Sequence, residues 1–343
     1  MTTADAIPVR KLRSPADVID AVPYLVGFHP SDSLVLLSLR GARKRLGLTA
    51  RVDLPAPGSE APLAAYVAGA LKRDEARSAY AVLYRTAGEP RPGPADEQIG
   101  SALSAAFEGQ GIEVEDIVLV LGGRFWSLLC RNPACCPAEG RAVHRPGSTP
   151  MAAHLVLEGR APFASRAAMV SLLHPPDAAE SERLRPLVKA AARRVPARRD
   201  SLAWGRWHRE TTRLLDDVVA RRVDDASPLG DQELATLLAC VRDVHVRDHM
   251  DAYVGTDRAD TAIALWIEMV RRAPPGFEVA PATMLAWAAY HGGNGGLANI
   301  ALDRALHGDP SYTLALLLRQ ALDHAIPPRA WRRPPRTRRS RRR

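Results

Sequence analysis

The chain has 343 residues, of which 46% are hydrophobic and 25% are charged, and its formal net charge is +9. This length and composition fit a globular protein with two domains rather than a low-complexity chain. Nine arginines and no acidic residue lie between Pro327 and Arg343, so residues 1–326 are formally neutral. The basic charge therefore belongs to a tail, and the composition argues against a folded nucleic-acid reader with a basic face.

The first half of the chain alternates helices with strands. Ser14-Pro15-Ala16-Asp17 combines an N-cap hydroxyl, a first-position proline and an acid, which predicts a helix start, and Pro23 predicts an early end. The elements expected next are a hairpin of strands 34–39 and 48–54, helix 62–73, strand 79–84, helix 96–107, and strands 116–121 and 124–130. This order predicts a mixed α/β sheet with helical cover, in a domain of residues 1–176.

After Pro175-Pro176 the pattern predicts helices only, so we expect an all-α domain over residues 177–326 and a disordered tail over residues 327–343. The expected helices are 180–195, 204–222, 231–253, 257–272, 282–290, 297–306 and 312–325. Ala298, Ala301, Leu302, Ala305 and Leu306 fall on one helical face. The stretch 279–312 is similar to one tetratricopeptide-type hairpin. An ordinary helical pair is the alternative, because only one such unit is visible.

The loop before the first predicted strand is the first candidate site. It contains His29 and Asp32, while Asp53 closes the second strand. If the two strands form a hairpin, Asp53 comes near His29 and provides an imidazole–carboxylate pair, the minimum for general-base chemistry. The alternative is structural: Asp32 satisfies backbone groups of the loop, and His29-Pro30 forms a rigid turn.

Three cysteines form a second candidate site. Cys130, Cys135 and Cys136 make a C-x4-C-C cluster, and Arg131 beside it favours a thiolate. A structural metal site needs four ligands, and His144 is the candidate for the fourth. Adjacent cysteines hold one ion awkwardly and the chain has no paired C-x2-C knuckle, so we predict buried structural thiols and no metal. Redox, disulfide or metal chemistry is the alternative.

Two further motifs favour structural roles. His245 and His249 lie at i and i+4, but Val246 replaces the glutamate of a zincin, so we predict a solvated helix face. The glycines at 292–296 follow a helix and precede no Lys-Ser/Thr pair, which excludes a phosphate loop. They also break the longest uncharged run, residues 279–302, so this run is not expected to span a membrane.

Residues 1–13 have no apolar core, so we expect a cytoplasmic protein with reduced thiols.

Several blocks of the sequence resemble one family. The two specific blocks near the N-terminus are 24–30 with 32–35, and 51–55, and the middle block is Trp126-Ser127, Cys130, Cys135-Cys136-Pro137 and Gly140. More generic helical blocks follow at 247–248, 265–266, 298–305, 309–311 and 326–328. Over residues 12–331 the chain resembles the DUF4192 family of actinobacterial proteins, a domain of unknown function. The resemblance implies a cytoplasmic two-part protein, brings no catalytic residue or cofactor, and leaves the arginine tail outside its pattern.

The sequence contains no complete catalytic constellation, so we expect a non-catalytic binding or regulatory protein. Its helical domain would bind a protein partner, and its α/β domain a small ligand. The first alternative is an enzyme built on His29, Asp32 and Asp53, or on Cys130. The second alternative is salt-sensitive association with nucleic acid or an anionic surface through the tail from Arg329 to Arg343.

Overall fold

The computed structural model describes residues 14–144, 147–157, 159–197 and 201–331. The chain divides into two compact units, Met1–Arg166 and Ala167–Arg343, which we call the α/β unit and the helical unit. The expected domain boundary at residue 176 falls inside the helical unit. Most of the arginine tail, residues 332–343, lies outside the described residues.

The α/β unit contains a six-stranded sheet with strand order β2-β1-β3-β4-β5-β6. The strands are β1 (Ser33–Arg40), β2 (Arg45–Asp53), β3 (Ala76–Arg85), β4 (Glu113–Leu121), β5 (Arg124–Ser127) and β6 (Arg141–Ala142). Strands β3 and β4 are parallel, and every other neighbouring pair is antiparallel. The predicted mixed α/β fold and the β1–β2 hairpin are therefore confirmed.

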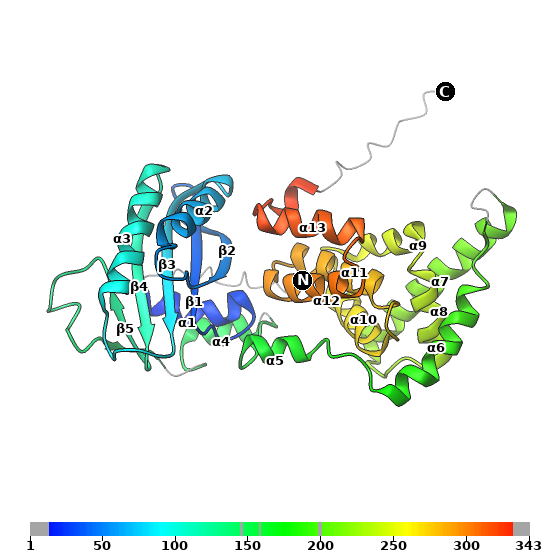
Figure 1. Ribbon diagram of the computed structural model, residues 1–343. Helices are drawn as coiled ribbons and strands as arrows, with labels where there is room; N and C mark the ends of the chain where they lie inside the picture. The colour runs from blue at the N-terminus through cyan, green and yellow to red at the C-terminus, as the bar shows by residue number, and fades with distance from the viewer. Residues whose placement is uncertain (1–13, 145–146, 158, 198–200, 332–343) are drawn as a thin grey trace, which may run out of the picture. The chain divides into compact units, whose positions relative to one another are not determined.

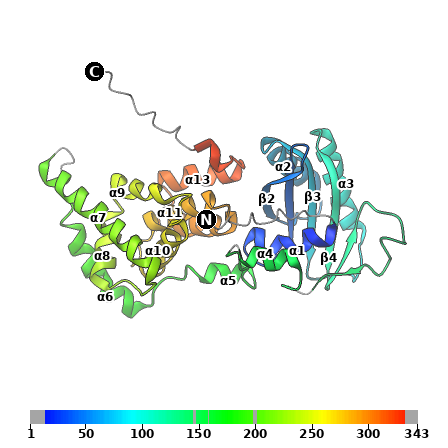
Figure 2. The same ribbon diagram turned by 180° about the vertical axis from the view of Figure 1, so that it is seen from behind.

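Helices cover both faces of this sheet because its central strands are apolar on both sides. Leu34 and Leu36 of β1 pack with α2 (Glu60–Arg73) and α3 (Pro94–Gly109). Val35 and Leu37 of the same strand pack with α1 (Pro15–Val26) on the opposite face. Helix α4 (Pro150–Leu157) packs against α1 through a small second cluster. Figures 1 and 2 show α2 and α3 on one side of the sheet and α1 with α4 on the other.

Helix α1 begins as the sequence predicts but ends later. The Ser14 hydroxyl accepts from the Asp17 amide, and the Asp17 carboxylate accepts from the Ser14 amide, which closes a capping box. The expectation that Pro23 ends this helix is wrong, since the helix runs on to Val26. Proline removes one backbone donor, and burial of the last turn compensates for that loss. The helix ends at Gly27, whose φ of 89° is left-handed and whose amide donates to the Pro23 carbonyl.

A buried carboxylate anchors the β1–β2 hairpin to the end of α2. Asp74 is 2% exposed. Its Oδ2 accepts from Arg40 Nε (2.8 Å), Ser38 Oγ (2.6 Å) and the Leu48 amide (2.8 Å), and its Oδ1 accepts from the Arg40 guanidinium as well. A Cβ at Gly47 would collide with this group, which explains a glycine inside a strand.

We expect Asp74→Ala to lower the free energy of unfolding by about 3 kcal/mol, because it leaves the Arg40 guanidinium and a buried hydroxyl without their acceptor. Urea unfolding followed by circular dichroism measures this change. Asp53→Ala is the matched control: its carboxylate is 83% exposed, so its loss should cost less than about 0.5 kcal/mol. Equal midpoints for the two variants would contradict the anchoring role of Asp74.

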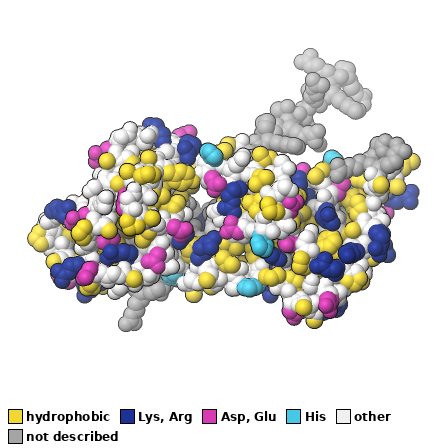
Figure 3. All heavy atoms as spheres, in the orientation of Figure 1, with side chains coloured by type: hydrophobic (Ala, Val, Ile, Leu, Met, Phe, Trp, Pro, Cys, Tyr) yellow, Lys and Arg dark blue, Asp and Glu magenta, His cyan; other side chains and the backbone are white. Residues whose placement is uncertain are grey.

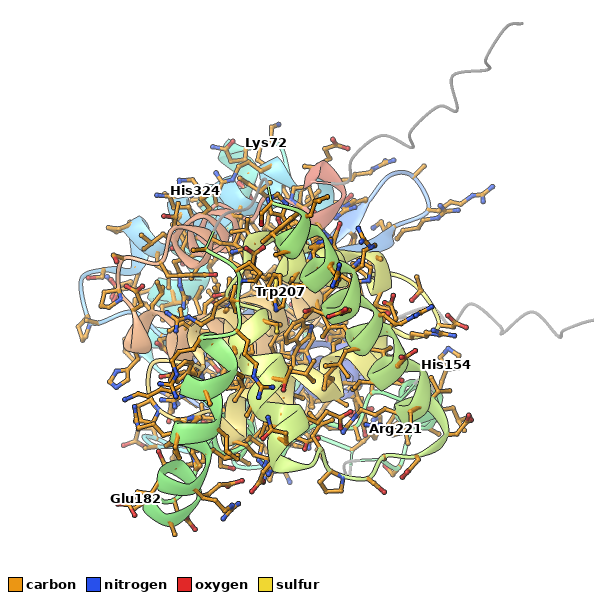
Figure 4. All side chains as sticks on the ribbon, turned by 90° about the vertical axis from the view of Figure 1, so that its right-hand side faces the viewer. Lys72, His154, Glu182, Trp207, Arg221 and His324 are labelled. Carbon is orange, nitrogen blue, oxygen red and sulfur yellow. The ribbon has the colours of Figure 1, made fainter. Side chains whose placement is uncertain are left out.

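The helical unit contains helices only among its described residues. They are α6 (Ala178–Ala192), α7 (Leu202–Asp224), α8 (Asp231–Cys240), α9 (Val244–His249), η1 (Met250–Tyr253), α10 (Ala259–Arg272), α11 (Val279–His291), α12 (Gly295–Gly308), α13 (Thr313–Asp323) and η2 (Pro328–Trp331), with α5 (Arg166–Ser171) at the junction of the units. The single helix expected over residues 231–253 is wrong, because the Asp243 carboxylate accepts from the His245 amide and starts a new helix. Figure 4 shows Glu182 near the start of α6 and Arg221 near the end of α7.

Half-buried ion pairs connect α6 and α8 to α10. The Arg272 guanidinium contacts Glu180 of α6 (2.7 Å), Asp231 of α8 (2.7 Å) and Glu268 of its own helix (3.1 Å). Figure 3 shows basic and acidic side chains interspersed over the visible face of the described residues. No described helix is long and apolar enough to cross a membrane.

Candidate functional site

The loop before β1 uses its aspartate to hold the backbone. Asp32 has a left-handed φ of 43°, and its carboxylate accepts from the Thr86 amide (3.0 Å) and the Thr86 hydroxyl (2.6 Å). These hydrogen bonds keep the pKa of Asp32 below its ordinary value. Asp53 lies opposite Ser33 in the β1–β2 ladder, and its exposed carboxylate pairs with Arg51 at 2.6 Å. Each carboxylate thus has a partner other than His29.

His29 instead lines a cavity of about 100 Å³ between α1 and the residues that precede α4. The His29 amide donates to the Phe163 carbonyl, which fixes the loop over the cavity. Burial lowers the pKa of the His29 imidazole below 6.5, since the charged form loses hydration there. The other lining residues are Ile19, Asp20, Pro23, Tyr24, Pro30, Tyr84, Val120, Val143, His144, Gly147, Thr149 and Ala152.

An imidazole–carboxylate pair lies in this cavity, made of residues other than the expected ones. His144 Nδ1 is 2.6 Å from Asp20 Oδ2, and the Asp20 side chain is only 8% exposed. The sequence analysis named His144 as a fourth ligand for the thiols, whereas the structure places it with Asp20. The only signal for Asp20 in the sequence is an acid within the apolar stretch of α1, which alone does not indicate a site.

The hydroxyl of Tyr84 is the second polar group that the sequence analysis missed. Tyr84 is the last residue but one of β3, lines the cavity and is 8% exposed. Its hydroxyl has no hydrogen-bond partner among the described residues. Burial, together with the nearby Asp20 carboxylate, raises the pKa of Tyr84 far above its ordinary value, so the hydroxyl keeps its proton. A buried hydroxyl without a partner costs about 1–3 kcal/mol, and native proteins contain few such groups.

The lowered pKa of His29 predicts a pH dependence of stability. The unfolded chain takes up the His29 proton near pH 6.5, whereas the folded protein takes it up only at lower pH. The free energy of unfolding should therefore fall as the pH drops below 6.5, and His29→Gln should flatten that slope. Urea midpoints at a series of pH values measure it. His174→Gln, at an exposed position, should keep the wild-type slope, and identical slopes for all three proteins would contradict the assignment.

The three clustered cysteines line another cavity, of about 270 Å³, at the start of α1. All are free thiols. Sγ of Cys135 lies 3.0 Å from Sγ of Cys130 and 3.7 Å from Sγ of Cys136. The expectation of buried thiols is wrong, since Cys135 is exposed and the other two are half-buried. The reason is that they lie on the loop between β5 and β6, outside the buried clusters of the sheet.

The thiols of this cluster differ in acidity. Hydrogen bonds from Cys135 and Cys136 lower the pKa of Cys130. Burial, together with the neighbouring thiols, raises the pKa of Cys136 to about 12. Asp116 lines the same cavity and accepts from Ser127 Oγ at 2.6 Å, and burial raises its pKa.

His245 and His249, the i and i+4 pair of the sequence, contact different partners. His249 Nε2 is 2.8 Å from Asp216 Oδ1 on α7. The His245 ring packs edge-on against Trp204, with 5.4 Å between ring centroids. Each imidazole has its own neighbour on α7.

The fold defines a protein of two units, in which a mixed α/β unit precedes a helical unit along the chain. The family described as "Domain of unknown function (DUF4192)" matches residues 15–329, and the chain belongs to this family. The matched range includes the described residues that line both cavities, apart from Ser14. No curated protein matches the chain, and no solved structure does.

Proposed function

We propose that this protein is a binding protein whose α/β unit takes up a small organic ligand in the cavity of Asp20, His29, Tyr84 and His144. The observation that carries the proposal is the Tyr84 hydroxyl, buried at the cavity wall without a partner among the described residues. A ligand oxygen beside it would supply the missing hydrogen bond and recover its cost. The Tyr84 hydroxyl would then have a hydrogen-bond partner in the bound state.

The cavity wall narrows the chemistry of that ligand. A volume of about 100 Å³ exceeds by several-fold the ~10–15 Å³ that one water occupies, so it admits a group of several non-hydrogen atoms. Ile19, Val120 and Val143 offer apolar contact, whereas the two imidazoles and Tyr84 offer hydrogen bonds. This combination suits a small molecule with an apolar body and one oxygen acceptor.

Native mass spectrometry of the freshly purified full chain tests the proposal. We expect a mass above that of the denatured chain, and we expect Tyr84→Phe to lose the extra mass while gaining about 1 kcal/mol of stability, because the unpartnered hydroxyl is removed. Tyr80→Phe, at a half-buried position on the same strand, should retain the extra mass. A native mass equal to the denatured mass, together with no thermal stabilisation by a panel of small carboxylic acids and amides, would contradict it.

For the helical unit, the proposed role is contact with a protein partner. What supports it is the hairpin of α11 and α12, in which the small residues Ala298, Ala301 and Ala305 are fully buried and let the helices approach closely. This is the arrangement on which the tetratricopeptide-like proposal rests. On the next helix, Leu316 is 40% and Leu317 is 47% exposed, so α13 presents apolar surface to a partner.

General-base catalysis is a second candidate function, favoured by the bond between His144 and Asp20. A carboxylate that holds Nδ1 leaves Nε2 as the nitrogen that takes up a proton, and such a pair activates water or a hydroxyl for hydrolysis. The enzyme considered from the sequence would use His29 with Asp32 or Asp53, or Cys130. The candidate proposed here uses His144 and Asp20 instead.

Release of p-nitrophenol from a series of p-nitrophenyl esters tests this candidate. We expect a rate above that of buffer, and we expect His144→Gln to lower it by roughly 100-fold, the scale of general-base catalysis. His174→Gln changes an exposed imidazole and should retain the rate. Equal rates in the two variants would show that His144 does not act as the base, and would remove the candidate.

A further inference from the structure

Three thiols converge at one point of the α/β unit without forming a disulfide. The sulfur atoms of Cys130, Cys135 and Cys136 all lie within 4.8 Å of one another. A Zn–S bond of about 2.3 Å at tetrahedral angles places two sulfurs about 3.8 Å apart. The separation of 3.7 Å between Cys135 and Cys136 matches that edge, and the 3.0 Å between Cys130 and Cys135 reaches it by a small widening.

The local backbone holds the two adjacent cysteines in this position. The Asn132 carbonyl accepts from the amides of Cys135 (3.2 Å) and Cys136 (2.8 Å), and the Asn132 side chain accepts from the Ala134 amide (3.0 Å). The chain therefore makes a tight turn just before the cysteine pair. Adjacent cysteines do not ordinarily direct both sulfur atoms to one ion. This turn brings the two sulfurs to the separation that a shared ion needs.

Both ends of the loop are fixed to the sheet. On one side the Cys130 amide donates to Ser127 Oγ (3.0 Å), and this hydroxyl in turn donates to Asp116. On the other side Trp126 Nε1 donates to the Ala138 carbonyl (3.1 Å). Gly140, with a φ of 73°, lies so close to the Trp126 ring that any Cβ would collide with it. The thiols are thus held by the fold, as a preformed cation site requires.

We propose that Cys130, Cys135 and Cys136 bind one thiophilic divalent cation of the zinc class through three thiolates. The fourth coordination position then faces the adjoining cavity of about 270 Å³. Three protein ligands with an open fourth position are the arrangement in which a zinc ion binds an exogenous ligand. Three thiolates and a divalent cation carry one net negative charge, and Arg141 at the same cavity offers the compensating charge.

Cobalt(II) titration of the reduced, chelator-treated full chain tests this site. We expect one cobalt per chain, with the near-ultraviolet band of thiolate-to-cobalt charge transfer, and displacement by zinc. Cys135→Ser changes an exposed side chain, so it should fold normally while losing the band and weakening zinc binding at least about 100-fold. Ser127→Ala keeps all three thiols but removes the hydroxyl that holds the Cys130 and Leu129 amides and bonds Asp116, so it should weaken binding roughly 10- to 100-fold with the band retained.

Cys240→Ala is the matched control, since this buried thiol of α8 lies in the helical unit and should leave the titration unchanged. A reduced wild-type chain that develops no charge-transfer band overturns the proposal. So does a band that persists in Cys135→Ser. Non-reducing mass spectrometry distinguishes the competing chemistry: a Cys130–Cys135 disulfide that forms in the presence of excess zinc would assign the cluster to redox exchange instead.

Discussion

The α/β unit depends on the packing of α1 across one face of its sheet. Val18, Ile19, Val22 and Val26 of this helix are buried against the alternate side chains of β1, β3 and β4, and each such side chain contributes roughly 1.5–3 kcal/mol. Both cavities border this one helix. Its N-cap Ser14 and first residues Pro15 and Ala16 line the thiol cavity. Four residues further along, Ile19, Asp20, Pro23 and Tyr24, line the cavity of Asp20 and His144. A capping box and a left-handed glycine set the two ends of the helix, and so place both sites.

The two cavities offer different chemistry on the same face of the sheet. One combines imidazoles, a carboxylate and a phenol, which suits a small molecule with an oxygen acceptor or a proton transfer. The other gathers three sulfur atoms, which suit a soft cation. At Tyr84 the fold buries a hydroxyl that has no hydrogen-bond partner among the described residues, and an unsatisfied buried hydroxyl costs stability.

Local patterns predicted the elements well where one physical rule decided the outcome. The alternation of helices and strands, the capping box at Ser14 and the β1–β2 hairpin follow from neighbouring residues alone. The sequence pattern fails at Pro23, because burial of the last turn outweighs one missing donor. It fails again over residues 231–253, because the Asp243 side chain caps a new helix within an apparently continuous pattern.

The sequence by itself determined that the chain combines a mixed α/β part with a helical part, that His29 lies at a candidate site, and that three cysteines cluster in one loop. Only the tertiary structure decided the partners of these groups. Asp20 and His144 are 124 positions apart, and Tyr84 comes from a third element, so no spacing reveals their meeting. Register in a sheet and the packing of a helix on it are long-range properties, whereas periodicity reports only which side of an element is apolar.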